Sequence, residues 1–139
     1  MILHCSYEET RSLTRGTQVF LTGDRGDGTV LAPPLEVAAV EELARRLGGD
    51  LSASSYREIE DLESGLDAVT NVLRSEMDAM VLATHPGGEE SINAYFDYGN
   101  ALTVLTRARE LKDEMKALIE LMTGGPVDEV SAREVSFPD

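Results

Sequence analysis

Residues 56–83 read YREIEDLESGLDAVTNVLRSEMDAMVLA and residues 89–123 read EESINAYFDYGNALTVLTRARELKDEMKALIELMT, with THPGG at 84–88 between them. Large apolar residues recur in both long stretches, mostly at steps of three and four, which is typical of a helix with one buried side. The first stretch carries Ile59, Leu62, Leu66, Val69, Leu73, Met77 and Met80. The second carries Ile92, Phe96, Leu102, Leu105, Ala108, Leu111, Met115, Leu118 and Met122. We therefore expect two long helices, each burying one apolar stripe.

The residues between the two stretches predict a sharp reversal of the chain. Pro86 ends the first helix, because the residue before a proline disfavours the helical conformation. Glu89 and Glu90 suit the positively polarised N-terminus of the second helix. A tight break gives an antiparallel hairpin. Its expected neighbours are Met80 and Ile92, Leu73 and Gly99, Leu66 and Leu105, and Leu62 and Leu111, with Gly99 making room for a leucine.

The first third of the chain predicts two shorter helices. Ser6-Tyr7-Glu8-Glu9 fits a capping box that starts a helix over about 7–22, and residues 1–5 could form an edge strand. Pro33-Pro34 suits the first turn of a second helix, which Gly48-Gly49 ends. The short helices would pack on the long hairpin.

Together these elements predict an all-α fold that resembles a four-helix bundle. Ser55-Tyr56-Arg57-Glu58 is a second capping box, at the start of the first long helix, and Gly124-Gly125-Pro126 ends the second. Residues 1–126 then form a single helical domain, and residues 127–139 form a tail that is an edge strand, a docked arm or disordered. Two short helices cannot cover long helices of roughly 40–50 Å. We therefore expect apolar surface to remain for a second copy or another protein.

The net charge of the chain limits the classes of partner that it can bind. Its 139 residues carry a formal net charge of −14, which disfavours direct binding of nucleic acid or anionic membranes, because phosphate recognition needs a basic surface. The acidity could serve solubility, steer a basic partner, or mimic a nucleic-acid backbone. The acidic cluster on the first long helix comprises Glu58, Glu60, Asp61, Glu63 and Asp67, and such a run is usually a solvated helix face.

Cys5 is the only cysteine in the sequence, which limits the disulfide and metal chemistry open to the chain. Cys5 cannot form an intrachain disulfide or a cysteine metal cluster, so a reducing, cytoplasmic location is the plain interpretation. His4 neighbours Cys5, but adjacent residues on a strand point to opposite faces and cannot easily act together. We predict no catalytic residue, metal or cofactor.

One group of polar residues surrounds the break in the hairpin and is the candidate site. It comprises His85, Glu89, Glu90, Asn93, Tyr95, Asp97 and Tyr98. A histidine, two carboxylates and an amide near one turn could hold a metal ion or move a proton. Ordinary helix capping explains the same residue types and is the favoured interpretation, with a partner-binding surface as the third. Of the aromatic residues, Phe96 is expected to face the core, and Tyr95 and Tyr98 either face a partner or pack under the N-terminal helix.

The sequence is thus interpreted as a non-enzymatic helical interaction module, an adaptor, scaffold or assembly subunit that associates with itself or with another protein. One alternative is an acidic mimic of nucleic acid that inhibits a basic protein. The other is a small helical enzyme or metal-binding protein with its site at the 85–97 turn.

Overall fold

The computed structural model describes residues 1–22, 34–83 and 89–135, and within them the fold is all-α. The helices are α1 (Tyr7–Thr22), α2 (Pro34–Arg46), α3 (Tyr56–Ala83), α4 (Glu89–Thr123) and α5 (Glu129–Arg133). Two short strands, β1 (Ile2–Leu3) and β2 (Leu51–Ser52), pair antiparallel with Leu3 opposite Leu51. The sequence indicated a strand at the N-terminus but gave no sign of β2. None of the described helices is both long enough and apolar enough to cross a membrane.

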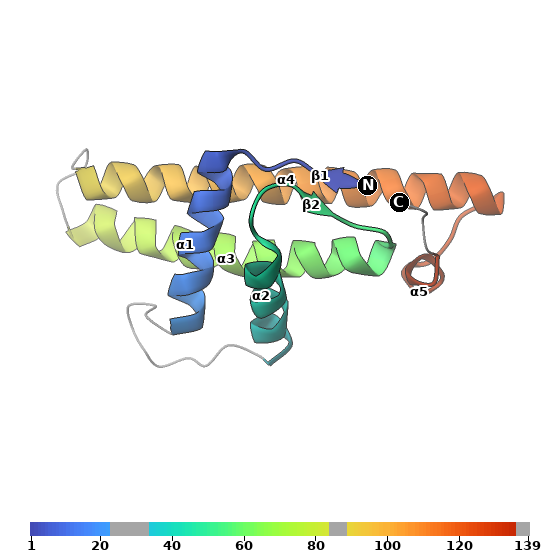
Figure 1. Ribbon diagram of the computed structural model, residues 1–139, viewed down its shortest axis with the longest axis horizontal. Coiled ribbons are helices and arrows are strands. Elements are labelled where there is room, and N and C mark those ends of the chain that lie inside the picture. The colour runs from blue at the N-terminus through green and yellow to red at the C-terminus, as the bar shows by residue number, and fades with distance from the viewer. Residues whose placement is uncertain (23–33, 84–88, 136–139) are drawn as a thin grey trace.

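α3 and α4 form the predicted antiparallel hairpin, and they make up the long axis of the molecule (Figure 1). Ion pairs join them: Lys112 Nζ lies 2.9 Å from Glu63 Oε1, and Arg109 lies 3.2 Å from Asp67 Oδ1 and 3.7 Å from Glu63 Oε2. As the residue number rises along α3 it falls along α4, so these pairs confirm that the two helices run antiparallel. The buried side of α3 follows the predicted stripe through Ile59, Leu62, Leu66, Val69 and Leu73.

The predicted stripe of α4 is wrong in part. Its buried side consists of Ala94, Ala101, Val104, Leu105, Ala108, Met115 and Ile119. Ile92, Phe96, Leu102, Leu118 and Met122, which were assigned to the stripe, are exposed. The inner side includes three alanines, and small residues let two helices approach closely, while several of the larger apolar residues lie on other sides of α4.

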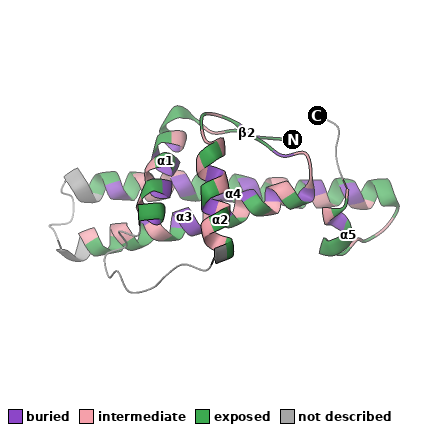
Figure 2. Cartoon of the chain, turned by 60° about the horizontal axis from the view of Figure 1, so that its bottom comes forward, coloured by how far each residue is buried: buried purple, intermediate pink, exposed green. Residues whose placement is uncertain are grey.

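The two shorter helices lie across the hairpin, and the buried residues gather where the helices face one another (Figures 1 and 2). Each of the two shorter helices meets α3 at a point where a glycine allows close approach. A Cβ at Gly16 of α1 would collide with Val69 Cγ1 and lie 3.0 Å from Leu73 Cδ1. A Cβ at Gly65 of α3 would lie 2.8 Å from the carbonyl oxygen of Ala39 in α2. The glycine that makes room for Leu73 is therefore Gly16, and the expectation for Gly99 is wrong.

The N-terminal capping box is formed as predicted. The Glu9 N–H donates to Ser6 Oγ at 3.1 Å, and the Ser6 N–H donates to Glu9 Oε1 at 2.8 Å. The second capping box is only half formed. Ser55 Oγ accepts from the Glu58 N–H at 3.2 Å, but the Glu58 carboxylate accepts from the Ser54 N–H at 2.8 Å instead of from Ser55.

The tail returns toward the hairpin as a docked arm. α4 has 35 residues against 28 in α3, and its end extends beyond the start of α3 (Figure 1). Gly124, with φ +85°, follows the end of α4, and α5 packs against α3 with Ala132 fully buried. The Arg133 guanidinium binds both carboxylate oxygens of Glu60, at 2.6 and 3.0 Å. Residues 136–139 lie outside the described part of the chain.

Candidate functional site

Three of the seven residues of the predicted site have no described side chains. His85 lies in the undescribed residues 84–88, and Glu89 and Glu90 belong to the first turn of α4 without described side chains. The hypothesis of a metal ion or proton transfer at the turn therefore stays a prediction. Asn93 is exposed and lines a groove between α1 and α4.

This groove has a volume of about 640 Å³, and its charged residues bind one another. It is lined by Glu8, Arg11, Arg15, Asn93, Phe96, Asp97 and Asn100. Arg15 pairs with Asp97 at 2.9 Å and with Glu76 of α3, and Arg11 pairs with Glu8 at 3.0 Å. Burial alone would lower the pKa of Arg15, but its two carboxylate partners outweigh burial and raise it.

Asp97 serves to hold α1 on the hairpin. Besides Arg15, its carboxylate accepts a hydrogen bond from the Ser12 hydroxyl at 2.7 Å, and Ser12 in turn accepts from the Asn100 amide at 3.0 Å. The Asp97 carboxylate is thus occupied within the chain, in contrast to its predicted place among the residues of a polar site. The groove offers paired charges and amides, which suit packing and polar contacts better than proton transfer.

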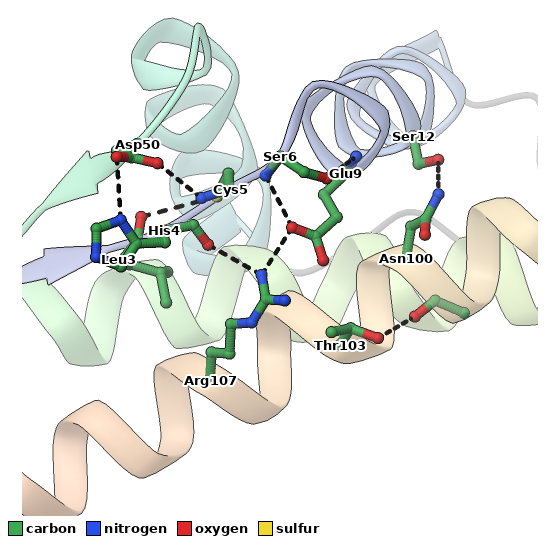
Figure 3. A network of polar contacts seen from close by, with 11 residues as sticks. Leu3, His4, Cys5, Ser6, Glu9, Ser12, Asp50, Asn100, Thr103 and Arg107 are labelled. Atoms are coloured by element: carbon green, nitrogen blue, oxygen red, sulfur yellow. Dashed lines mark hydrogen bonds and ion pairs between the residues drawn. The ribbon is translucent and has the colours of Figure 1, made fainter.

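A second polar network joins the N-terminus to α4 (Figure 3). Arg107 Nη1 donates to Glu9 Oε1 at 2.7 Å and to the His4 carbonyl at 3.1 Å. His4 Nδ1 lies 3.1 Å from Asp50, which also accepts from the Cys5 N–H at 2.9 Å. Burial, together with the negative charges of Glu9 and Asp50, raises the pKa of the Cys5 thiol to about 11. Cys5 is therefore a poor nucleophile at neutral pH.

The outer side of α4 carries an exposed face without charges. Ile92, Phe96, Gly99, Thr103 and Thr106 follow one another at steps of three and four, and so share this side of the helix. Tyr95 and Leu102 flank them. We call these seven residues the uncharged face. Tyr95 is 63% exposed and Phe96 59% exposed, with their rings edge to face at a centroid distance of 6.0 Å.

The threonines of the uncharged face need no outside hydrogen-bond partner. Thr103 Oγ1 donates to the Gly99 carbonyl (Figure 3), and Thr106 Oγ1 donates to the Leu102 carbonyl, both at 2.8 Å. What remains for a partner is apolar and aromatic surface around Gly99, where an added Cβ would meet nothing within 4 Å.

The structure separates the three aromatic residues that the sequence grouped together. Phe96 does not face the core, so that expectation is wrong. Of the two tyrosines, Tyr95 is exposed, whereas Tyr98 is half-buried and packs against the core. The apolar periodicity of α4 assigns Ile92, Phe96 and Leu102 to the buried stripe, and so it does not predict the uncharged face. The signal available in the sequence was the charge pattern, since Asp97 is the one charged residue in 92–106.

Most of the acidic cluster on α3 is occupied within the molecule. Glu60 binds Arg133, Glu63 binds Lys112, and Asp67 binds Arg109. Glu58 caps its own helix, and Asp61 remains exposed. These carboxylates hold α4 and α5 in place, an arrangement that gives little support to mimicry of a nucleic-acid backbone.

Comparisons with protein-family models, with curated proteins and with solved structures found no match to this chain.

Proposed function

We propose that this chain is a non-enzymatic helical interaction module that associates with a second copy of itself through the uncharged face of α4. The observation that carries the proposal is a contrast in charge. The chain holds 26 acidic and 12 basic residues, yet the uncharged face has none and is open to solvent. Exposed apolar surface of this kind marks interaction sites on soluble proteins, and aromatic residues are enriched at interface cores.

A second copy can meet this face on a two-fold axis at Gly99, because the face extends seven residues to either side of that glycine. Phe96 and Leu102 lie three residues to either side of Gly99, Tyr95 and Thr103 lie four, and Ile92 and Thr106 lie seven. A two-fold dimer uses the same patch on both copies, so the apolar and aromatic side chains of one copy meet those of the other. Since Gly99 has open space where a Cβ would be, two helix backbones can approach each other closely there.

Charge favours an antiparallel arrangement of the two copies of α4. Beyond Thr106 the helix carries exposed Glu110, Asp113 and Glu114. Parallel helices would place these carboxylates beside their counterparts, whereas antiparallel helices place them at opposite ends. With Gly99 facing Gly99, Tyr95 lies beside Leu102 of the second copy.

Sedimentation velocity over a range of protein concentrations tests this function. We expect the chain to approach dimer mass as concentration rises, and Gly99→Arg to remain a monomer with unchanged helix content, because its added side chain fits the monomer and blocks the close approach. Ser75→Arg is the control, with the same change of charge at an exposed position of α3. A native chain that stays monomeric up to its solubility limit would contradict the proposal, and so would a Gly99→Arg variant that dimerises like Ser75→Arg.

A further inference from the structure

The far end of α4 presents an apolar patch that no described element covers. Leu118, Leu121 and Met122 are 40%, 79% and 65% exposed. The reason is visible in Figure 1: β1 lies along the middle of α4, and the helix continues past it and past the start of α3. Three large apolar side chains in water are a cost that a covering partner would remove.

The charges beside this patch indicate what would cover it. Glu110, Asp113 and Glu114 lie one to two turns before the apolar residues, and Glu110, Glu114, Leu118 and Leu121 follow at steps of four, four and three on one side of α4. In the described part of the chain, no salt bridge involves these three carboxylates, unlike Glu60, Glu63 and Asp67 of α3. We call the three carboxylates and the three apolar residues together the acidic–apolar surface.

We infer that the acidic–apolar surface binds a cationic amphipathic helix of a partner protein, whose apolar side chains cover Leu118, Leu121 and Met122 while its lysines or arginines meet the three carboxylates. The surface is about 20 Å long, which matches three to four turns of helix. The net charge of −14 would draw such a segment toward the protein and speed its association.

Two other occupants fit less well. A parallel second copy would bring three carboxylates against three, and an antiparallel one would set the carboxylates against the apolar side chains, so neither arrangement neutralises these charges. Nucleic acid would be repelled for the same reason. The acidic–apolar surface lies beyond Thr106 and so outside the uncharged face. It stays accessible in a monomer and at the ends of an antiparallel dimer, and this inference does not depend on self-association.

Titration of a synthetic peptide by calorimetry tests the inference. The probe is a helical peptide of about 18 residues with leucines at steps of three and four in one half and lysines on the same side of the other half. Its control replaces every lysine by glutamate. We expect the lysine peptide to bind, its affinity to fall as salt is raised, and the glutamate peptide to show no binding.

Two sets of variants locate the binding. Leu121→Ser with Met122→Ser removes apolar contacts at exposed positions, and Glu110→Gln, Asp113→Asn and Glu114→Gln together remove three charges. We expect each set to weaken binding by about tenfold or more. The matched control neutralises Glu36, Glu41 and Asp78, which changes net charge equally but lies on α2 and α3, and it should weaken binding much less.

Three outcomes would overturn the inference. They are the absence of binding by the lysine peptide at low salt, equal losses of affinity in the two sets of charge variants, and unchanged affinity in the Leu121→Ser, Met122→Ser variant. Each of these outcomes can occur whether or not the chain dimerises. The peptide titration can therefore refute this inference without refuting the proposed self-association, and the reverse also holds.

Discussion

At the scale of single residues, Gly65 lies where α2 crosses α3. A Cβ built on it would lie 2.8 Å from the carbonyl oxygen of Ala39 and 3.2 Å from Leu43 Cβ. A backbone carbonyl cannot move aside as a flexible side chain can, so the two helices would have to separate. Glycine costs a helix up to about 1 kcal/mol relative to alanine, and at this position the closeness of packing outweighs that cost.

A pair of alanine substitutions tests this packing. We expect Gly65→Ala to lower the free energy of unfolding by about 1–3 kcal/mol, because it overpacks the crossing of α2 and α3. At concentrations where the chain is a monomer, Gly99→Ala should raise it by about 0.5–1 kcal/mol, since the helix gains a better helix former and the Cβ meets open space. Urea unfolding of both variants measures the difference, and stabilisation by Gly65→Ala would contradict the crossing.

Glu9 supports a prediction about pH. Burial by itself would raise the pKa of Glu9, but hydrogen bonds from the Ser6 N–H and the Arg107 guanidinium outweigh it and lower the pKa below its ordinary value of 4.5. A lowered carboxyl pKa stabilises the fold above 4.5, and this stabilisation is lost as the pH falls through the pKa of the folded protein.

Glu9→Gln should therefore destabilise the protein at pH 7 by about 1–3 kcal/mol. The difference from the native chain should shrink as the pH falls below 4.5. Chemical unfolding at a series of pH values measures both effects, and a difference that grows on acidification would refute this account of Glu9.

At the scale of elements, the sequence predicted the bounds of α1, α3 and α4 well, since proline, glycine and capping boxes mark helix ends locally. It predicted the buried side of α3, where the large apolar residues lie on one side. It failed for α4, where apolar residues lie on several sides and alanines occupy the inner one. Which side faces α3 depends on packing with α3, and that information is not local to α4.

α5, with five residues, is the shortest of the described helices. Its anchors are the buried Ala132 and the Arg133–Glu60 ion pair. Ala132→Asp should release α5, because an unpaired carboxylate cannot be buried there without a large cost. We expect amide hydrogen exchange in 131–135 to accelerate by about tenfold or more, with the exchange of α3 and α4 unchanged. Ser131→Asp, at an exposed position of the same helix, is the control and should leave α5 docked.

At the scale of the whole molecule, the net charge of −14 acts on the two proposed interactions in opposite directions. Two like-charged copies repel each other, so dimerisation should strengthen as salt rises from about 0.01 M to about 0.15 M and the screening length falls from about 30 Å to about 8 Å. Binding of a cationic peptide should weaken over the same range. Sedimentation and calorimetry measure the two trends, and dimers that dissociate as salt is added would argue against an uncharged interface.

The candidate site was predictable only in outline. Surplus apolar surface followed from helix length, since two short helices cannot cover a long hairpin. Its location did not follow, because the positions of α1 and β1 decide which parts of α4 are covered. Asp97 is a second case in which the sequence pattern does not predict the contacts. The sequence grouped Asp97 with a polar site, whereas in the fold it binds Arg15 and Ser12 of α1, a helix that is far away in the sequence.

The most direct test of the central claim is thiol cross-linking of single-cysteine substitutions on α4. With Gly99 facing Gly99 in an antiparallel dimer, Gly99→Cys should be joined to its counterpart by a short bifunctional thiol reagent. Thr106→Cys should not be joined, since the two positions 106 would lie about 21 Å apart. Cys5 should contribute little at neutral pH, because its pKa is about 11, and the native chain serves as the control for it. A covalent dimer with Gly99→Cys alone is the predicted result. Equal cross-linking at both positions would indicate a parallel pair, and no cross-linking at Gly99→Cys would show that the uncharged face does not meet itself.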